Sequence, residues 1–268
     1  MRSRPKEYAG LVLKATQLHS NRIVLGIPVT GLVRIEWVHA RYGQIIPCNW
    51  SHAECHQWLR QDMPHGFAVA EARNLIVDKF IKSKAEWLFF IDHDVILPPD
   101  CFVKMNQYMI KAKQPVVAGL YFAKCHPAEP LLYRGRGNGY YGKWTLGDKV
   151  WVDGIPMGCT LIHRSLLEPM WNDAEDYTVG SDQGRQKIRK VFDTPAGVIV
   201  DPQIGIRTYS GTEDLAWCNR VIAGGYLKKS AWPDLAKQRY PFLVDTSMVC
   251  RHVTPEGQIY PLRADGRP

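Results

Sequence analysis

The sequence predicts an α/β protein in which helices flank a mostly parallel central sheet. Segments with the length and composition of buried strands alternate with segments of helical period through the first half of the chain. The 268 residues suffice for one large domain, and the apolar and charged contents of 46% and 22% are those of a globular protein. We therefore expect one doubly wound domain over residues 22–253. Residues 1–21 would be an N-terminal extension and residues 254–268 a C-terminal tail.

Local signals place the individual elements. The expected strands cover residues 22–29, 87–91, 115–122, 149–154, 158–162 and 241–245, and residues 248–250 follow the last of them. The expected helices cover residues 33–41, 71–84, 101–112, 165–170 and 215–223. Pro98-Pro99-Asp100 begins the third of these helices, and Gly224-Gly225 ends the last. Residues 171–211 lose this regularity and read as a long excursion with one short strand at 198–200.

The most informative motif is Asp92-His93-Asp94, which directly follows the apolar strand Trp87-Leu88-Phe89-Phe90-Ile91. Ligands of open α/β sheets bind beyond the carboxyl ends of such strands. Two carboxylates at that place form an oxygen site suited to a divalent metal that carries a ligand's phosphates. An acidic turn without function remains an alternative, because Asp often begins turns.

Other polar residues fall at the starts of helices or the ends of strands. Arg73 and Asn74 lie early in a helix, where they could face a nucleotide. Glu213 and Asp214 head another helix after Thr212, a placement that the helix dipole alone would also favour.

These motifs, in this order, resemble the family-2 type of GT-A-fold glycosyltransferases, including phage-encoded and small bacterial members. The resemblance is carried by a strand ending in Pro28 and Thr30, by Ala72-Arg73-Asn74, by Asp92-His93-Asp94, and by Glu213-Asp214 with the later Val244-Asp245-Thr246 and His252. It implies a single GT-A, Rossmann-like domain and a hexosyl transfer from a nucleotide-sugar, either a UDP-sugar, which is favoured, or a GDP-sugar. It also implies Mn²⁺ or Mg²⁺ as cofactor.

The resemblance assigns roles to residues. Asp92, Asp94 and His252 would bind the metal, and Pro28, Thr30, Arg73 and Asp92 would line the nucleotide. Asp214 would be the general base of an inverting reaction, with Glu213 contacting the acceptor or the sugar. Gly119 and Gly158 could let a sugar approach, although packing explains them equally well. The acceptor is left open among a glycan, a small molecule, a protein and DNA.

Two other classes of function stay open. A phosphohydrolase of the haloacid-dehalogenase type would use Asp92 as nucleophile and Asp94 as acid–base, but it would normally carry this motif on its first strand. A basic nucleic-acid-binding protein would agree with the net charge of +8. It would leave the four acids at 92, 94, 213 and 214 without a purpose.

Cysteine usage and hydropathy suggest a cytoplasmic location. Seven scattered cysteines do not form a disulfide framework, and no apolar run is long enough to span a membrane. Cys48, His52, Cys55 and His56 form the densest group of potential zinc ligands, but their spacing matches no standard zinc motif.

Overall fold

The computed structural model describes residues 23–29, 31–50, 64–83, 85–135, 139–181, 184–201 and 205–262. A six-stranded sheet with the order β1-β2-β6-β4-β11-β5 forms its centre. Its strands are Ile23–Gly26 (β1), Trp87–Ile91 (β2), Cys159–His163 (β6), Val116–Leu120 (β4), Phe242–Val249 (β11) and Lys149–Val152 (β5). β1, β2, β4 and β11 run in one direction, whereas β6 and β5 run antiparallel to their neighbours. The prediction of a mostly parallel sheet flanked by helices is thus confirmed.

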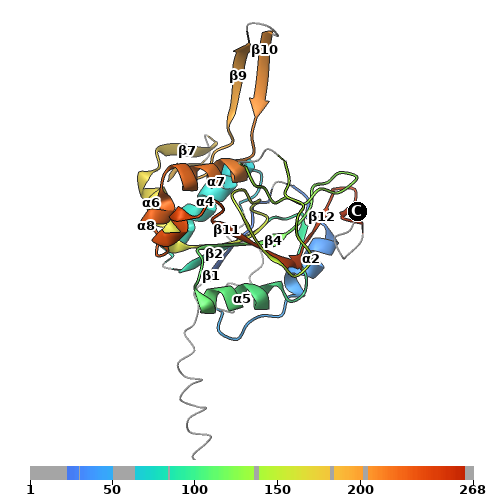
Figure 1. Cartoon of the computed structure of the whole chain (residues 1–268). Coiled ribbons are helices and arrows are strands. Elements are labelled where there is room, and N and C mark those ends of the chain that lie inside the picture. The colour runs from blue at the N-terminus through green and yellow to red at the C-terminus, as the bar shows by residue number, and fades with distance from the viewer. Residues whose placement is uncertain are drawn as a thin grey trace, which may run out of the picture.

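Helices cover both faces of this sheet (Figure 1). On one face lie Val69–Lys82 (α4), Arg164–Asp173 (α6), Glu213–Ala223 (α7) and Tyr226–Lys229 (α8), and on the other lie Ile35–Tyr42 (α2) and Cys101–Lys111 (α5). The side chains of β2 alternate between the two cores, because successive residues of a strand point to opposite faces. Leu88 and Phe90 pack under α4, while Trp87, Phe89 and Ile91 pack toward α5. This two-sided burial is why residues 87–91 are uniformly apolar.

After the end of α6 at Asp173, the segment up to residue 211 contains two antiparallel β-hairpins, so the expectation of a loose excursion with one short strand is corrected. Asp176–Ser181 (β7) pairs with Gly184–Arg189 (β8), and Ala196–Asp201 (β9) pairs with Gly205–Ser210 (β10). The second hairpin projects from the body as a separate ribbon (Figure 1). β8 is mostly exposed and rich in charged residues, so it lacks the apolar pattern by which a strand is recognised.

A small sheet completes the fold next to the acidic motif. It joins Val95–Ile96 (β3), Arg251–Val253 (β12) and Ile259–Tyr260 (β13), in the order β13-β12-β3. β13 lies in the segment predicted as a tail, and it pairs with His252 and Val253. A 3₁₀ helix, Pro233–Lys237, precedes β11. In the described part of the chain, no helix combines the length and apolarity needed to cross a bilayer.

Candidate active site

The acidic motif lies where the sequence placed it, at the carboxyl end of β2. The backbone N–H of Asp92 donates to the carbonyl of Gly158 at 3.0 Å, and Trp37 Nε1 donates to the carbonyl of Asp92 at 2.8 Å. Val95 N–H then donates to the same Asp92 carbonyl at 3.1 Å and closes the turn. These bonds with Gly158, Trp37 and Val95 fix the backbone from which both carboxylates project.

Arg73 joins the two acidic segments of the chain. Its Nη2 donates to Asp92 Oδ2 at 3.1 Å, and its Nε donates to Glu213 Oε1 at 3.1 Å. The residue is only 1% exposed, and its guanidinium lies over the ring of Phe90, 5.1 Å from the centroid. α4, β2 and α7 therefore meet at one buried cation, and three of the predicted site residues lie together.

Asn74, next to Arg73, serves the fold and not the site. Its Oδ1 accepts from the backbone N–H groups of Val191 and Phe192 at 2.9 and 2.7 Å, and its Nδ2 donates to the Phe192 carbonyl and to Tyr177 Oη. The suggestion that Asn74 could face a nucleotide is therefore corrected, because these bonds occupy its amide.

Asp94 and His252 are brought together by the pairing of β3 with β12. Val95 lies opposite His252, and Val253 N–H donates to the Asp94 carbonyl at 2.8 Å. As a result, His252 Nε2 lies 4.0 Å from Asp94 Oδ1. The other oxygen of Asp94 forms an ion pair with Lys124, a residue that no sequence motif singled out.

The remaining residues singled out in the sequence have different relations to the site. Pro28 is buried after β1, and Thr30 lies outside the described residues. Gly158 touches the site, because a Cβ there would lie 2.8 Å from both Asp92 Oδ2 and Tyr121 Oη. Gly119 instead faces the thiols of Cys159 and Cys250, so core packing accounts for it. Cys48 is exposed, and the other members of its cluster (His52, Cys55 and His56) lie outside the described residues.

Burial and neighbouring charges shift the pKa values of the site's acids in different directions. Burial raises the pKa of Asp92 to about 7 although Arg73 opposes the shift, and the charges of Asp94, Glu213 and Asp214 add to it. Burial and Glu213 also raise the pKa of Asp214. For Asp94, burial favours a higher pKa, but the interactions with His252 and Lys124 outweigh this effect. The pKa of Asp94 is therefore lowered. Burial lowers the pKa of His252, which is therefore neutral near pH 7.

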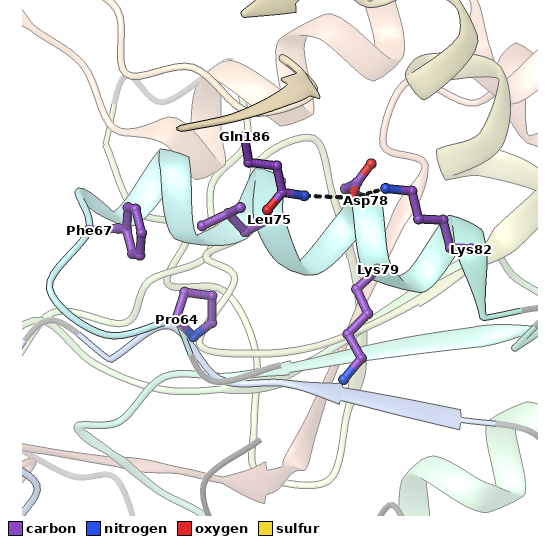
Figure 2. A pocket seen from close by; sticks show the side chains of 7 residues that line it. All are labelled: Pro64, Phe67, Leu75, Asp78, Lys79, Lys82 and Gln186. Carbon is purple, nitrogen blue, oxygen red and sulfur yellow. Dashed lines mark hydrogen bonds and ion pairs between the residues drawn. The ribbon is translucent and has the colours of Figure 1, made fainter. Parts of the chain in front are cut away.

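Two hollows lie near these elements. One of about 170 Å³ adjoins Asp94 and is lined by Leu32, Arg34, His93, Asp94, Lys124, Val253, Thr254 and Pro255. The other, of about 560 Å³, lies along α4 (Figure 2) and is lined by Pro64, Phe67, Leu75, Asp78, Lys79, Lys82 and Gln186. None of the predicted site residues is among the lining residues of the larger hollow. The four from α4 follow the i, i+3, i+4, i+7 spacing of one helix face, and Arg73 is not on it.

Comparisons with known proteins identify no family for this chain. No protein-family model matches it, and no curated protein matches it. Among solved structures, the crystal structure of A197 from STIV matches with 16% identity over 89% of this chain and 92% of that chain, with a TM-score of 0.49. We draw nothing about activity from a likeness of this degree.

Proposed function

We propose that the protein is a glycosyltransferase that uses a divalent cation and moves a sugar from a nucleoside diphosphate to an acceptor hydroxyl, with inversion. The observation that carries this proposal is that Arg73 joins the two acidic segments, because it bonds both Asp92 and Glu213. Asp214 follows Glu213, and Asp94, two residues after Asp92, faces His252. The family resemblance adds the expectation of a UDP-sugar as donor.

The polar groups of the site fit a cation that arrives with its ligand. Among the described residues, no three His, Cys, Asp or Glu side chains are gathered closely enough to hold a metal alone. Mn²⁺ and Mg²⁺ bound with nucleotides, however, need only one or two carboxylates, because phosphates and water supply the other ligands. Asp94 supplies one such carboxylate, and His252 Nε2, which lies 4.0 Å from it, offers a nitrogen ligand beside it.

Unsatisfied groups at the centre of the site support the same interpretation. Asp92 Oδ1 is buried and receives no hydrogen bond from the described residues, although Arg73 Nη2 lies 3.0 Å away. Arg73 Nη1 is likewise buried without an acceptor in that part of the chain. Buried polar atoms without partners are rare, and at a binding site a ligand can supply the partner.

The charge of the cluster points the same way. Among the described residues, the permanent cations that form ion pairs with any of its four carboxyl groups (Asp92, Asp94, Glu213 and Asp214) are Arg73 and Lys124. Burial is the main cause of the raised pKa values of Asp92 and Asp214, and the charges of the neighbouring acids add to it. A divalent cation would supply the positive charge that balances the remaining carboxylates.

Each residue then has a role in the proposed reaction. A cation held by Asp94 and His252 would neutralise the charge that develops on the departing diphosphate. Asp92, oriented by Arg73, would hold the donor through its free oxygen. Asp214 would take the proton of the acceptor hydroxyl, since a carboxylate with a raised pKa is a stronger base than an ordinary one. Glu213 fixes Arg73 and thereby links the donor and acceptor sides.

The first test is ligand binding followed by thermal denaturation. UDP-, GDP- and other nucleotide-sugars are added with Mn²⁺ or with a chelator. A ligand at a hundred times its Kd stabilises the fold by about 2.7 kcal/mol, which raises the Tm by several degrees. We expect the shift with one nucleotide, only in the presence of the metal.

Asp94→Ala should abolish this metal-dependent shift, because it removes the main cation ligand. Asp100→Ala is the matched control, since Asp100 is a half-exposed acid paired with Lys104 on α5 and takes no part in the site. The proposal fails if no nucleotide raises the Tm of the wild type with any divalent metal.

A further inference from the structure

Lys124 is paired with Asp94, whose carboxylate the proposed function assigns to a metal. Its ammonium group forms an ion pair with Asp94 Oδ2, and about a third of the lysine side chain is exposed. Asp94 Oδ1 on the other side faces His252 Nε2. One carboxylate is therefore placed between a permanent cation and an imidazole nitrogen.

The orientation of His252 is fixed by the backbone. Its Nδ1 lies 2.5 Å from the carbonyl oxygen of Phe122, and a carbonyl can only accept. Nδ1 must therefore carry the hydrogen, and in the neutral ring the lone pair of Nε2 points toward Asp94. The ring nitrogen that faces Asp94 Oδ1 is therefore Nε2, and a cation between the two residues could be bound by both.

One loop controls both neighbours of Asp94. Phe122, which fixes His252, and Lys124 lie two residues apart, at the start of the loop that returns at Pro130. The base of this loop is held by Ala123 N–H donating to Glu129 and Leu131 N–H donating to Tyr121, at 2.8 and 2.9 Å. Residues 124–127 beyond the base are exposed. The histidine is therefore held in place, while the long lysine side chain is the part that can move.

The adjoining hollow of about 170 Å³ offers Lys124 a second position. Arg34, His93 and Lys124 line it together with the Asp94 carboxylate, so it suits an anionic group such as a phosphate once a cation neutralises Asp94. The Arg34 guanidinium is already engaged by Glu36 and by the Pro255 carbonyl. Lys124 differs from Arg34 because its partner is Asp94, the proposed metal ligand. A cation bound to Asp94 would leave Lys124 without this partner.

We propose that Lys124 is an internal counter-ion, which neutralises Asp94 in the free protein and gives up this carboxylate to the divalent cation when a nucleoside diphosphate binds, then contacting the diphosphate. The proposal rests on the proposed function, since it concerns the same cation and the same ligand. It adds that the protein itself competes with the metal until the nucleotide arrives.

The test uses Lys124→Met, which keeps the length of the side chain and removes its charge. In the absence of nucleotide, Mn²⁺ should bind the variant on the order of tenfold more tightly than the wild type, because a competing cation is gone. In saturating Mn²⁺, UDP should bind the variant several-fold more weakly. Mn²⁺ binding is followed by the electron paramagnetic resonance of the free ion, and UDP binding by calorimetry.

Two controls separate charge from structure. Lys124→Arg keeps the positive charge and should stay close to the wild type in Mn²⁺ affinity. Lys149→Met removes a similar partner from Asp245, which lies outside the site, and should change neither affinity.

The outcomes distinguish this proposal from the proposed function. If the wild type binds Mn²⁺ and UDP but Lys124→Met leaves the Mn²⁺ affinity unchanged or lowers it, the counter-ion role is wrong and the function stands. If neither the wild type nor the variant binds Mn²⁺ or UDP, both proposals are overturned.

Discussion

At the scale of single residues, Arg73 decides which acids are free to react. It engages Asp92 and Glu213, two acids from distant parts of the chain, in one buried cluster. Removing one partner of such a pair typically costs about 3–5 kcal/mol, because a buried charge is left uncompensated. Asp214 forms no ion pair with the described residues, and its contacts are hydrogen bonds with the Thr212 side chain and the Leu215 N–H. It is therefore the acid best placed to accept a proton.

Asp214→Asn tests this assignment with a minimal change of shape. We expect transfer to fall by about two to four orders of magnitude, since the amide cannot take the acceptor proton. Binding of UDP with Mn²⁺ should stay within about twofold of the wild type. The pKa of Asp214 is raised above its ordinary value of 3.8. In the wild type, the rate of transfer should therefore fall as the pH drops through this raised pKa, because the protonated acid cannot act as a base.

Asp193→Asn serves as the control, because Asp193 is an exposed acid whose partner is Lys190. A wild-type rate of transfer by Asp214→Asn would rule out this residue as the base. A covalent phosphate trapped on Asp92 would instead support the phosphohydrolase alternative.

At the scale of elements, the sequence predicted the parts with strong local signals and missed those set by pairing between distant segments. The bounds of β2 followed from an apolar run, and the helix expected over residues 215–223 is α7, which begins two residues earlier at Glu213. Lys124 carries no such signal, because its position beside Asp94 depends on how the loop after β4 folds back. In the described sheets, β7 pairs only with β8 and β9 pairs only with β10. These strands therefore need no apolar face toward the main sheet.

The start of α6 provides a test of helix capping that is independent of the site. His163 is the N-cap, and its Nδ1 accepts from Ser165 N–H at 3.1 Å. Trp87 and Trp232 meet its ring edge to face. Burial and, to a lesser extent, the charge of Arg164 lower the pKa of His163 to about 4. The folded protein therefore keeps this histidine neutral where the unfolded chain, with a pKa near 6.5, would protonate it.

The sign of the resulting pH dependence follows from this difference. Because the unfolded state binds more protons between about pH 6.5 and 4, stability is complete above that window and falls as the pH drops through it. His163→Asn keeps a capping side chain that does not titrate. Between pH 7.5 and 5.0 the variant should lose on the order of 1 kcal/mol less stability than the wild type. Chemical denaturation at the two pH values measures the difference, with the exposed His39→Asn as control. Equal losses in wild type and His163→Asn would refute the assignment.

At the scale of the whole molecule, the net charge and the site have opposite signs. The chain carries a formal charge of +8, whereas in the described part of the chain only two permanent cations form ion pairs with any of the four carboxyl groups of the candidate site. Dispersed lysines and arginines attract any polyanion over long range. The site itself would repel a diphosphate unless a metal accompanied it. The total charge, which alone would suggest nucleic-acid binding, therefore says nothing about what the site holds.

Salt and the Asp94→Ala variant together separate these two kinds of anion binding. Single-stranded DNA bound by dispersed basic residues should lose on the order of a hundredfold or more in affinity between 50 and 300 mM salt, because counterions are released on binding. UDP bound through Mn²⁺ at Asp94 should lose less than about fivefold, since a contact in a partly buried site is poorly screened. Asp94→Ala should abolish the binding of UDP with Mn²⁺ and leave any DNA binding as strong as in the wild type. Fluorescence anisotropy with labelled DNA and calorimetry with UDP measure the two affinities. If UDP affinity followed salt as steeply as DNA affinity and survived Asp94→Ala, the nucleotide would be held by the basic surface and not by the acidic cluster.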